Sequence, residues 1–352
     1  MQRSIGRVGA ALGATLLIVA MTAAPALACG GLIGPNGAVN LLRTTTLAAY
    51  HDGAEHYVTA FQFAGGGGAF GSLTPLPGVP SSVEKGGDWT LQRLVRETDP
   101  QPALDALRVA APAAAGSAVE LMKVRIDALD VTVLRGGAAE VGRWARDHGF
   151  RLPPDAPEVL DFYAARSPIF LAAVFNADAA AARGQAVGDG TPVHVTIPTD
   201  NPWVPLRILA LGKTATERVD AAVYLLTDRR PALLPVPTRD DGLGLDHSAP
   251  ATASLLDDLR SDRGMGWVPS SGWLTKVTID AAASDLTFDL AIDASGAGAP
   301  SRVMAGLDRP GTVASPDRTA AMLPLILGLA LTFGGIGAIL VISRRRPPLS
   351  MA

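Results

Sequence analysis

Hydrophobic and polar positions alternate along much of this chain in the manner of β-strands. Two such runs, 44–50 (TTTLAAY) and 55–63 (EHYVTAFQF), flank the tetrapeptide 51–54 (HDGA). Asp-Gly supplies the positive φ of a tight turn, so the pattern predicts a β-hairpin. Two further strands are predicted, one at 124–134 (VRIDALDVTVL) and one at 168–178, where the apolar run is nearly continuous.

Other segments repeat their apolar positions with the period of a helix. In one of them Leu255, Leu256 and Leu259 would form a buried stripe, and Gly149 would close another. Proline pairs and glycines bound these segments, as expected for helix ends. Three short helices are therefore predicted, over 138–149, 156–165 and 251–264.

The second half of the chain predicts mainly strands. We expect strands over 194–199, 206–212 and 220–228, a loop over 231–250, and a terminal hairpin from 275–281 and 285–294. The whole predicts an α+β fold, rich in strands, with short helices. A polar, glycine-containing loop at 179–191 predicts two subdomains, 29–178 and 191–294.

The start of the chain has the pattern of a signal peptide. Arg3 and Arg7 precede an uncharged apolar run, and Ala26 and Ala28 flank Leu27 in the A-x-A pattern of a cleavage site. Residues 1–28 are therefore predicted to be removed on export.

A second apolar run near the other end predicts a membrane anchor. Residues 319–342 carry no charge over 24 positions, which at about 1.5 Å per residue suffices to cross about 30 Å of hydrocarbon. Three arginines follow at 344–346, and positive residues resist translocation. We expect a linker over 295–318, a transmembrane helix over 319–343 and a cytoplasmic tail over 344–352. The bulk of the chain would then be extracytoplasmic, at the cell membrane.

The exported portion is acidic. Five of the 30 Lys and Arg residues lie in the predicted signal peptide and tail, which contain no acidic residue. The remainder has 25 basic and 33 acidic side chains, a net charge of −8. Such a surface repels phosphate backbones, so nucleic acid is excluded as an expected partner.

Cys29 is the single cysteine and would be the first residue of the mature chain. It cannot form an intrachain disulfide. A lipoprotein signal places an aliphatic residue three positions before the cysteine, where this chain has Ala26. A spanning helix also anchors more firmly than acyl chains do, so we expect Cys29 to be unlipidated. Lipidation stays open as the alternative.

The stretch 62–72 (QFAGGGGAFGS) contains Gly66, Gly68 and Gly71 at the spacing of a dinucleotide-binding loop. Such a loop needs a helix directly after the glycines, because the helix N-terminus holds the pyrophosphate. Here the proline-rich segment 75–80 (PLPGVP) follows, which predicts extended chain. The glycines are interpreted as a flexible turn, and no cofactor is predicted.

Two short patterns could carry chemistry. His51 and His56, with Glu55, could face each other across the hairpin and bind zinc, but a zinc site needs three or four ligands. Ser82 and Lys85 match S-x-x-K, without the K-T-G and S-D-N partners of penicillin-recognising enzymes. Turn-exposed histidines and a chance match are the favoured interpretations.

Two dispersed sets of residues, one acidic and one of tryptophans, are further candidate binding sites. The acidic set lacks a D-x-D-x-D-G loop, which favours a solvated helix face over calcium binding. The tryptophans come from different elements, which favours core packing over a sugar platform. No metal site is predicted, and no catalytic residue is identified. The acidic set is Asp240, Asp241, Asp246, Asp257, Asp258 and Asp262, and the tryptophans are Trp144, Trp203, Trp267 and Trp273.

Several stretches resemble one family of bacterial exported proteins, the domain of unknown function 2330. The most specific is the block 131–175 (VTVLRGGAAEVGRWARDHGFRLPPDAPEVLDFYAARSPIFLAAVF), followed by 204–212 (VPLRILALG) and 221–228 (AAVYLLTD). The Cys-Gly-Gly start and the PLPGVP segment add to it, and the resemblance covers roughly 29–294. It implies export and a mixed fold, and it carries over no activity or catalytic residue. Family members often have more cysteines near the start.

These observations favour a non-catalytic binding or scaffold module of the cell envelope, with envelope proteins as partners. The alternative is an envelope hydrolase whose site a single sequence does not reveal. Ala330, Gly334 and Ala338 lie four apart and would put small residues on one face of the membrane helix. A homodimer is therefore conceivable but not favoured, because such residues are common throughout the chain.

Overall fold

The computed structural model describes residues 31–34, 37–38, 44–62, 70–99, 120–182, 190–240, 242–295 and 298–310. The described residues up to Asp308 belong to one compact unit. The predicted signal peptide, Cys29, the glycines at 65–68, the predicted membrane helix and the tail lie outside the described residues. Within those ranges, no helix has both the length and the apolar character needed to cross a membrane.

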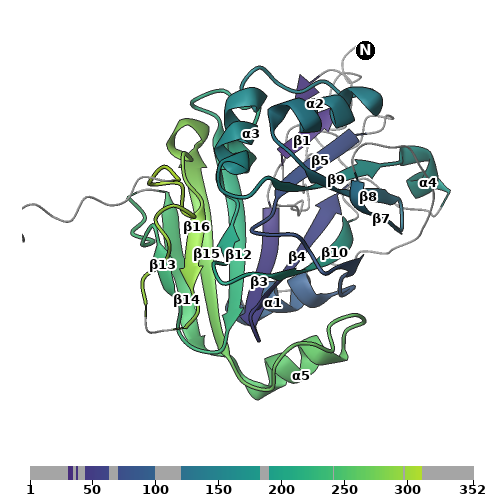
Figure 1. Ribbon diagram of the computed structural model, residues 1–352. Helices are drawn as coiled ribbons and strands as arrows, with labels where there is room; N and C mark the ends of the chain where they lie inside the picture. The colour runs from purple at the N-terminus through teal and green to yellow at the C-terminus, as the bar shows by residue number, and fades with distance from the viewer. Residues whose placement is uncertain are drawn as a thin grey trace, which may run out of the picture. The chain divides into compact units, whose positions relative to one another are not determined.

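The largest sheet has seven strands, in the order β14-β15-β12-β3-β4-β10-β6 (Figure 1). β12 and β3 pair in parallel, and the other neighbours in this sheet pair antiparallel. The strands are β3 (Thr44–His51), β4 (Ala54–Gln62), β6 (Ser82–Lys85), β10 (Gly190–Pro198), β12 (Arg218–Thr227), β14 (Leu243–Pro250) and β15 (Trp273–Ala282).

Two smaller sheets complete the strand layers. One has the order β2-β1-β5-β9-β8-β7 and the other the order β11-β16-β13. The first contains β1 (Gly31–Gly34), β2 (Gly37–Ala38), β5 (Phe70–Pro75), β7 (Glu120–Ile126), β8 (Leu129–Arg135) and β9 (Ile169–Phe175). The second contains β11 (Trp203–Val204), β13 (Ala232–Leu234) and β16 (Leu290–Asp293).

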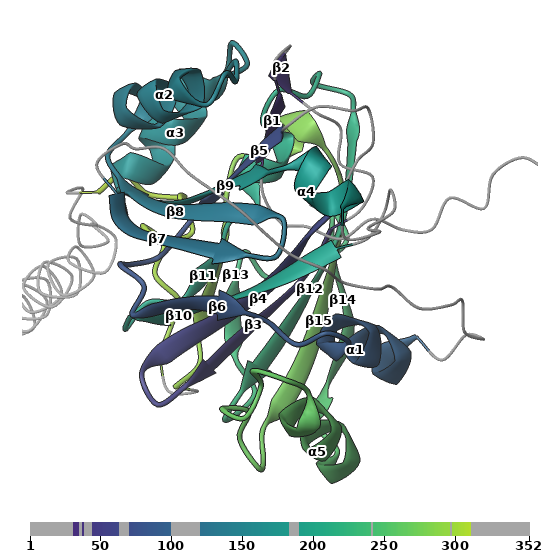
Figure 2. The same cartoon turned by 90° about the vertical axis from the view of Figure 1, so that its right-hand side faces the viewer.

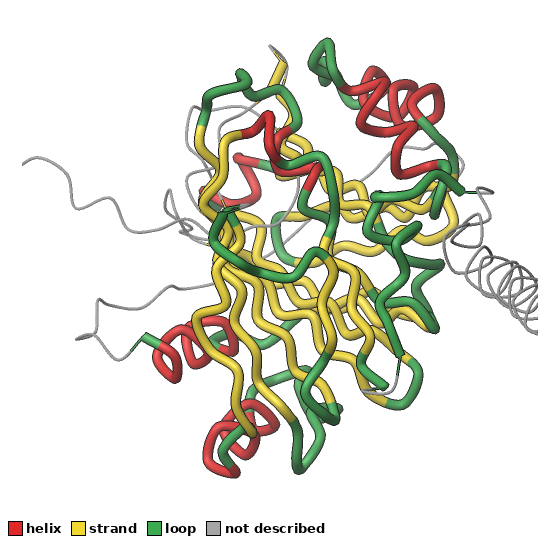
Figure 3. Tube along the Cα trace, turned by 90° about the vertical axis from the view of Figure 1, so that its left-hand side faces the viewer, coloured by secondary structure: helices red, strands yellow, loops and turns green. Residues whose placement is uncertain are grey.

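The helices are short and form two groups. α1 and α5 lie together, away from α2 and α3, and the tube trace also shows helices gathered at opposite ends of the sheets (Figures 1, 2 and 3). The α-helices are α1 (Thr90–Thr98), α2 (Ala138–Asp147), α3 (Ala156–Ala164), α4 (Ala177–Ala181) and α5 (Ala253–Ser261). Two 3₁₀ helices, η1 (Arg207–Ala210) and η2 (Ala283–Asp285), join strands.

Each face of the seven-stranded sheet packs against a different apolar cluster. Side chains alternate between the faces along each strand, so on β4 Tyr57 enters one cluster while Val58 and Ala60 enter the other. The larger cluster, here the main core, also takes in the six-stranded sheet, α2 and α3. The smaller one, here the covered-face cluster, lies under α1 and α5. The chain is thus a strand-rich α+β protein with few short helices, as predicted.

The first predicted hairpin is confirmed. β3 and β4 pair antiparallel, with His51 opposite Ala54. Asp52 has φ 50° and Gly53 has φ 75°, the left-handed conformations that a two-residue turn requires. The strand predicted at 168–178 is likewise present as β9.

The three predicted helices are confirmed within a few residues, as α2, α3 and α5. The stripe of Leu255, Leu256 and Leu259 is buried against the covered-face cluster. Gly149 follows α2 with φ 76° and donates its N–H to the carbonyl of Arg146, which ends that helix.

The single strand predicted over 124–134 is wrong. The chain reverses at Asp127, which has φ 55°, so that β7 and β8 form a hairpin. Apolar residues continue through the turn, and Ala128 is itself buried. For this reason the hydrophobic pattern shows no break.

Three predictions in the second half are also wrong. Residues 206–212 contain η1 instead of a strand, and the predicted loop 231–250 contains β13 and β14. The expected terminal hairpin does not form, because β15 and β16 lie in different sheets. η2 follows β15 directly and turns the chain away before β16 begins.

Strands from both sides of residues 179–191 share the seven-stranded sheet. β10 pairs with β4 along its whole length, and β12 pairs with β3. The loop predicted to separate two subdomains is therefore not a division between sheets. Residues at the start of the predicted linker also pack on this unit, since Ala305 is buried and its carbonyl accepts from the Asp289 N–H.

Candidate functional site

The sheet brings two histidines from distant parts of the chain together. His56 on β4 lies opposite Thr196 on β10, and His194 lies two residues before Thr196, on the same face. His56 Nδ1 is 3.0 Å from His194 Nε2, so one imidazole donates a hydrogen bond to the other. This pair, here the histidine pair, faces the covered-face cluster.

The Trp267 indole covers both imidazoles. Its ring centroid is 4.0 Å from that of His56, with an interplanar angle of 6°, and 5.1 Å from that of His194. Trp267 follows α5 and packs against the covered-face cluster. The three rings therefore form one stack between the sheet and the chain that leads from α5 to β15.

Burial keeps both imidazoles neutral at pH 7. Burial, together with a smaller effect of nearby His51, lowers the pKa of His56 from 6.5 to about 4, although Asp52 opposes the shift. Burial lowers the pKa of His194 to about 3, with a smaller contribution from His56. His194 is 3% exposed, and its Nδ1 has no hydrogen-bond partner within the described part of the chain.

The strand beside the histidine pair carries further polar side chains on the same face. Ser82 lies opposite Thr196 and Glu84 lies opposite His194, both on β6 at the edge of the sheet. The Thr196 hydroxyl is 3.4 Å from His194 Nε2. Nevertheless, across the ranges that the structure describes, no three His, Cys, Asp or Glu side chains are grouped so that they could hold a metal ion.

A third side chain with a shifted pKa, that of Glu55, lies on the opposite face of the sheet. It directly precedes His56 on β4, so its side chain enters the main core, where it is 0% exposed. One carboxyl oxygen accepts from the Trp203 backbone N–H, and the other has no partner among the described residues. Burial raises the pKa of Glu55 to about 8, although that hydrogen bond opposes the shift. The carboxyl is therefore largely protonated at pH 7.

A buried ion pair lies elsewhere in the main core. The Arg166 and Asp289 side chains are 1% and 0% exposed, and they meet at 2.6 Å. Asp289 also accepts from the Tyr163 hydroxyl at 2.8 Å and from the backbone N–H of Leu206 and Arg207. These donors neutralise the carboxylate, so the group joins α3 to β16 as a structural tie.

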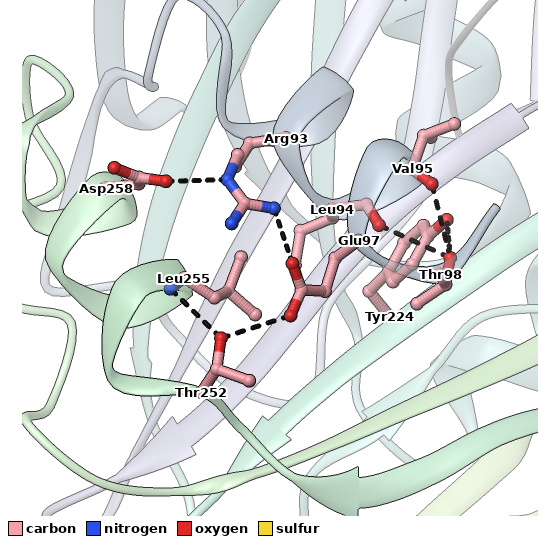
Figure 4. Close-up of polar contacts among 9 residues, drawn as sticks. All are labelled: Arg93, Leu94, Val95, Glu97, Thr98, Tyr224, Thr252, Leu255 and Asp258. Atoms are coloured by element: carbon pink, nitrogen blue, oxygen red, sulfur yellow. Dashed lines mark hydrogen bonds and ion pairs between the residues drawn. The ribbon is translucent and has the colours of Figure 1, made fainter. Parts of the chain in front are cut away.

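Polar contacts join the two helices over the covered face (Figure 4). Arg93 on α1 donates to Asp258 on α5 at 2.8 Å and to Glu97 at 2.7 Å. Glu97 in turn accepts from the Thr252 hydroxyl at the start of α5. Asp262, after α5, accepts from the Thr90 hydroxyl at 2.8 Å, so both ends of the helix pair are fixed.

The predicted candidates are largely separated or used for structure. His51 pairs with Asp228 at 2.7 Å, while His56 turns to His194, so the two hairpin histidines do not form a site. Ser82 and Lys85 lie on a strand, three residues apart, so they point to opposite faces. The S-x-x-K interpretation is thereby excluded, because that spacing brings two side chains together on a helix.

The acidic residues are also engaged within the chain. Asp257 and Asp258 pair with Arg260 and Arg93, and Asp246 pairs with Arg239. Asp262 is buried and accepts from backbone N–H groups at the start of α1. The interpretation as a solvated helix face therefore holds only in part. Asp241 lies outside the described residues.

The tryptophans do not form a platform. Trp144 and Trp203 are fully buried in the main core, as predicted for core anchors. Trp273 donates to Ser248, and Trp267 belongs to the histidine stack. The glycine-rich segment leads into strand β5, whose second residue is Gly71. Gly71 therefore leads into a strand and not into the helix that a pyrophosphate-binding loop needs. The turn predicted for the glycines at 65–68 lies outside the described residues.

Sequence reasoning missed the histidine pair because its members are 138 residues apart. Because side chains alternate between the two faces of a strand, the sequence places each histidine on one face of its own strand. Only the register between the strands shows that the two faces are the same. An available signal was HVTIPT, a strand pattern that starts with a histidine.

Comparison with solved structures gives distant similarities. A crystal structure of baculovirus P35 is 9% identical, with a TM-score of 0.38, and the match covers 71% of this chain and 96% of that chain. A mutated baculovirus P35 after caspase cleavage is also 9% identical, with a TM-score of 0.40, covering 71% and 98%. At these TM-scores the likeness assigns neither a fold nor a function to this chain. No curated protein matches the sequence.

The family resemblance noted in the sequence is confirmed. The matching family model is described as an uncharacterized protein conserved in bacteria, and it spans residues 23–235, more than half of the chain. The chain therefore belongs to the domain of unknown function 2330 family.

Proposed function

We propose that this chain is a single-pass membrane protein whose extracytoplasmic domain binds or scaffolds other proteins of the cell envelope. The sequence at both ends supports the location: a signal-peptide pattern at 1–28, and an uncharged run at 319–342 before the arginines at 344–346. The net charge of −8 on the exported portion supports proteins over nucleic acid as partners.

The main support for a non-catalytic role is the position of the side chains whose pKa values are shifted, Glu55, His56 and His194. General acid–base chemistry needs an acid and a base that reach the same substrate. Glu55 points into the main core and His56 into the opposite face, so these neighbours in sequence do not converge. His56 instead pairs with His194, and Trp267 covers both rings. This arrangement favours a structural or binding role over the alternative, an envelope hydrolase.

Fractionation of cells tests the anchor. A chain truncated after Arg318 should leave the membrane fraction, whereas the full chain should stay in it. A full-length chain with the run 319–342 intact and 344–346 changed to alanine serves as the control, because it should remain membrane-bound. Truncated protein that sediments with the membrane would contradict this topology.

Cross-linking and enzyme assays test the binding role. The tagged full chain, cross-linked in intact cells, should capture the same envelope protein in repeated experiments, and deletion of 31–308 should abolish the capture. The hydrolase alternative predicts that the purified chain cleaves an ester, glycoside or peptide substrate and that His194→Ala abolishes cleavage. Such an activity would overturn the proposed role.

A further inference from the structure

The segment that covers the histidine pair is held by ring stacking at Trp267 and by the burial of Met265 and Val268 in the covered-face cluster. Residues 263–272, here the Trp267 loop, lead from α5 to β15. Trp267 Nε1 is buried and has no hydrogen-bond partner among the described residues. The indole therefore stays in place through its contacts with His56 and His194 and its packing on the covered-face cluster.

The Trp267 loop has a fixed start and one glycine with open space beside it, next to Trp267. Asp262 holds that start, because it accepts from the N–H groups of Asp88 and Trp89. Gly264 has φ 79°, and a Cβ on Gly266 would meet no atom within 4 Å. Gly264 packs against the Lys85 carbonyl and Met265 is buried, so the open space lies at Gly266, directly before Trp267.

We propose that protonation of the His56–His194 pair releases the Trp267 loop from the sheet, so that the covered face opens in mild acid. The release is a conformational device of this domain, and it does not depend on the binding role or the membrane anchor.

The first proton destabilises the closed state less than the second, although burial opposes it as well. An imidazolium and an imidazole share it as an N–H···N hydrogen bond over 3.0 Å, and the Trp267 face attracts the charge through a cation–π interaction. The second proton cannot be accommodated. It leaves two N–H groups directed at each other and two positive charges together, one of them on a side chain that is 3% exposed. Each proton therefore favours opening, and the second favours it more strongly.

The surrounding charges do not compensate the second proton. Glu84, opposite His194 on β6, is exposed, and no carboxylate within the described residues forms an ion pair with either imidazole. In the hairpin, His51 and Asp52 act on His56 with opposite signs. The charged residue at the start of the Trp267 loop does not contact the histidine pair, because Arg263 forms an ion pair with Asp88. On the far side of β6, Lys85 also pairs with Asp88, and with Asp127, while Asp262 caps α1.

The sign of the pH dependence follows from the burial of the pair. Burial holds the pKa of His56 at about 4 and that of His194 at about 3, both below the ordinary 6.5 that the rings regain on opening. The closed form is thus fully favoured above pH 6.5 and loses ground as the pH falls toward 4. Uptake of two protons would raise the open-to-closed ratio up to about 100-fold per pH unit.

The test is ¹⁹F NMR of the full chain labelled with 5-fluorotryptophan, titrated from about pH 7.5 to about pH 4. The Trp267 resonance, assigned with Trp267→Phe, should change with a midpoint between 4 and 6.5, while that of Trp203 in the main core stays constant. The double variant His56→Gln/His194→Gln should lose this change. His51→Gln, which removes an exposed histidine of the same hairpin, should keep it.

Three results would overturn the proposal: a Trp267 resonance that is constant to about pH 4, an unchanged midpoint in the double variant, or a simultaneous change of Trp203. If the double variant does not fold at about pH 7.5, the single variants decide, because each keeps one titrating ring. In the single variants, the number of protons taken up in the Trp267 transition should fall from about two to about one. If these also fail to fold, a wild-type transition with a steepness of about two, confined to Trp267, supports the proposal, and a steepness of about one contradicts it.

Discussion

The two faces of the seven-stranded sheet are stabilised in different ways. The main core joins this sheet to the six-stranded sheet and to α2 and α3 through large buried side chains, including Trp144 and Trp203. Its ion pair, Arg166 with Asp289, is sealed from solvent. The covered-face cluster is smaller. α1, α5 and the Trp267 loop close it with buried apolar side chains, supplemented by partly exposed ion pairs and one aromatic stack.

This difference separates the part that maintains the fold from the part that can respond to its surroundings. Hydrophobic burial changes little with pH, whereas a stack that contains two imidazoles depends on their protonation. We therefore expect changes in the main core to affect the whole domain. Changes over the covered face should act more locally, because the apolar cluster beneath the cover is smaller than the main core.

The largest effect is expected from Asp289→Ala. The substitution leaves Arg166 charged and unpaired in the main core and removes the acceptor of the Tyr163 hydroxyl and of two backbone N–H groups. Removing one partner of a buried pair costs about 3 to 5 kcal/mol, which chemical denaturation at pH 7 would measure. Asp280→Ala, which breaks an exposed pair with Arg218, is the control and should cost far less. Equal losses would mean that burial does not distinguish the two pairs.

Glu55→Gln should stabilise the domain in alkaline solution. The folded-state pKa of about 8 lies above the ordinary 4.5, so the contribution of the protonated carboxyl is complete below pH 4.5 and is lost as the pH rises toward 8. Glutamine does not ionise, so the variant should gain about 2 to 4 kcal/mol over the wild type near pH 8. The gain should shrink near pH 4.5. Denaturation midpoints at several pH values would measure it, and a pH-independent difference would contradict the assigned burial effect.

The smallest effect is expected from Arg93→Ala, which removes the ion pair between α1 and α5. The Arg93 side chain is 14% exposed, and its partner Asp258 is 46% exposed, so solvent screens much of the interaction. The loss should be about 1 kcal/mol or less. It should appear as faster hydrogen exchange in α1 and α5, with β9 unaffected. Arg96→Ala, at an exposed position of the same helix, is the control.

Local features of this fold could be predicted because their causes lie close together in the sequence. The β3–β4 turn follows from Asp52 and Gly53, and the buried stripe of α5 follows from three leucines. β14 was missed because its segment begins at Gly242, after a proline-rich stretch, and lies at the edge of the sheet. The turn at Asp127 was missed because apolar residues run through it.

The candidate site could not be predicted, because it depends on strand pairing. The sequence marks His56 as a candidate, but the partner that it suggests is His51, in the same hairpin. The true partner, His194, comes from β10, and the pairing of β10 with β4 fixes which side chains meet. Trp267 reaches the pair from a loop whose position depends on α5. Such a site depends on contacts between distant segments, which the periodicity of a single segment does not record.

Hydrogen exchange of the wild-type full chain, measured by mass spectrometry near pH 7.5 and near pH 5 and corrected for intrinsic rates, tests the contrast between the faces most directly. The account predicts that protection of the Trp267 loop falls by about tenfold or more at the lower pH, while protection of β8 and β9 is unchanged. Equal loss of protection on both sides, or constant protection of the loop, would contradict it.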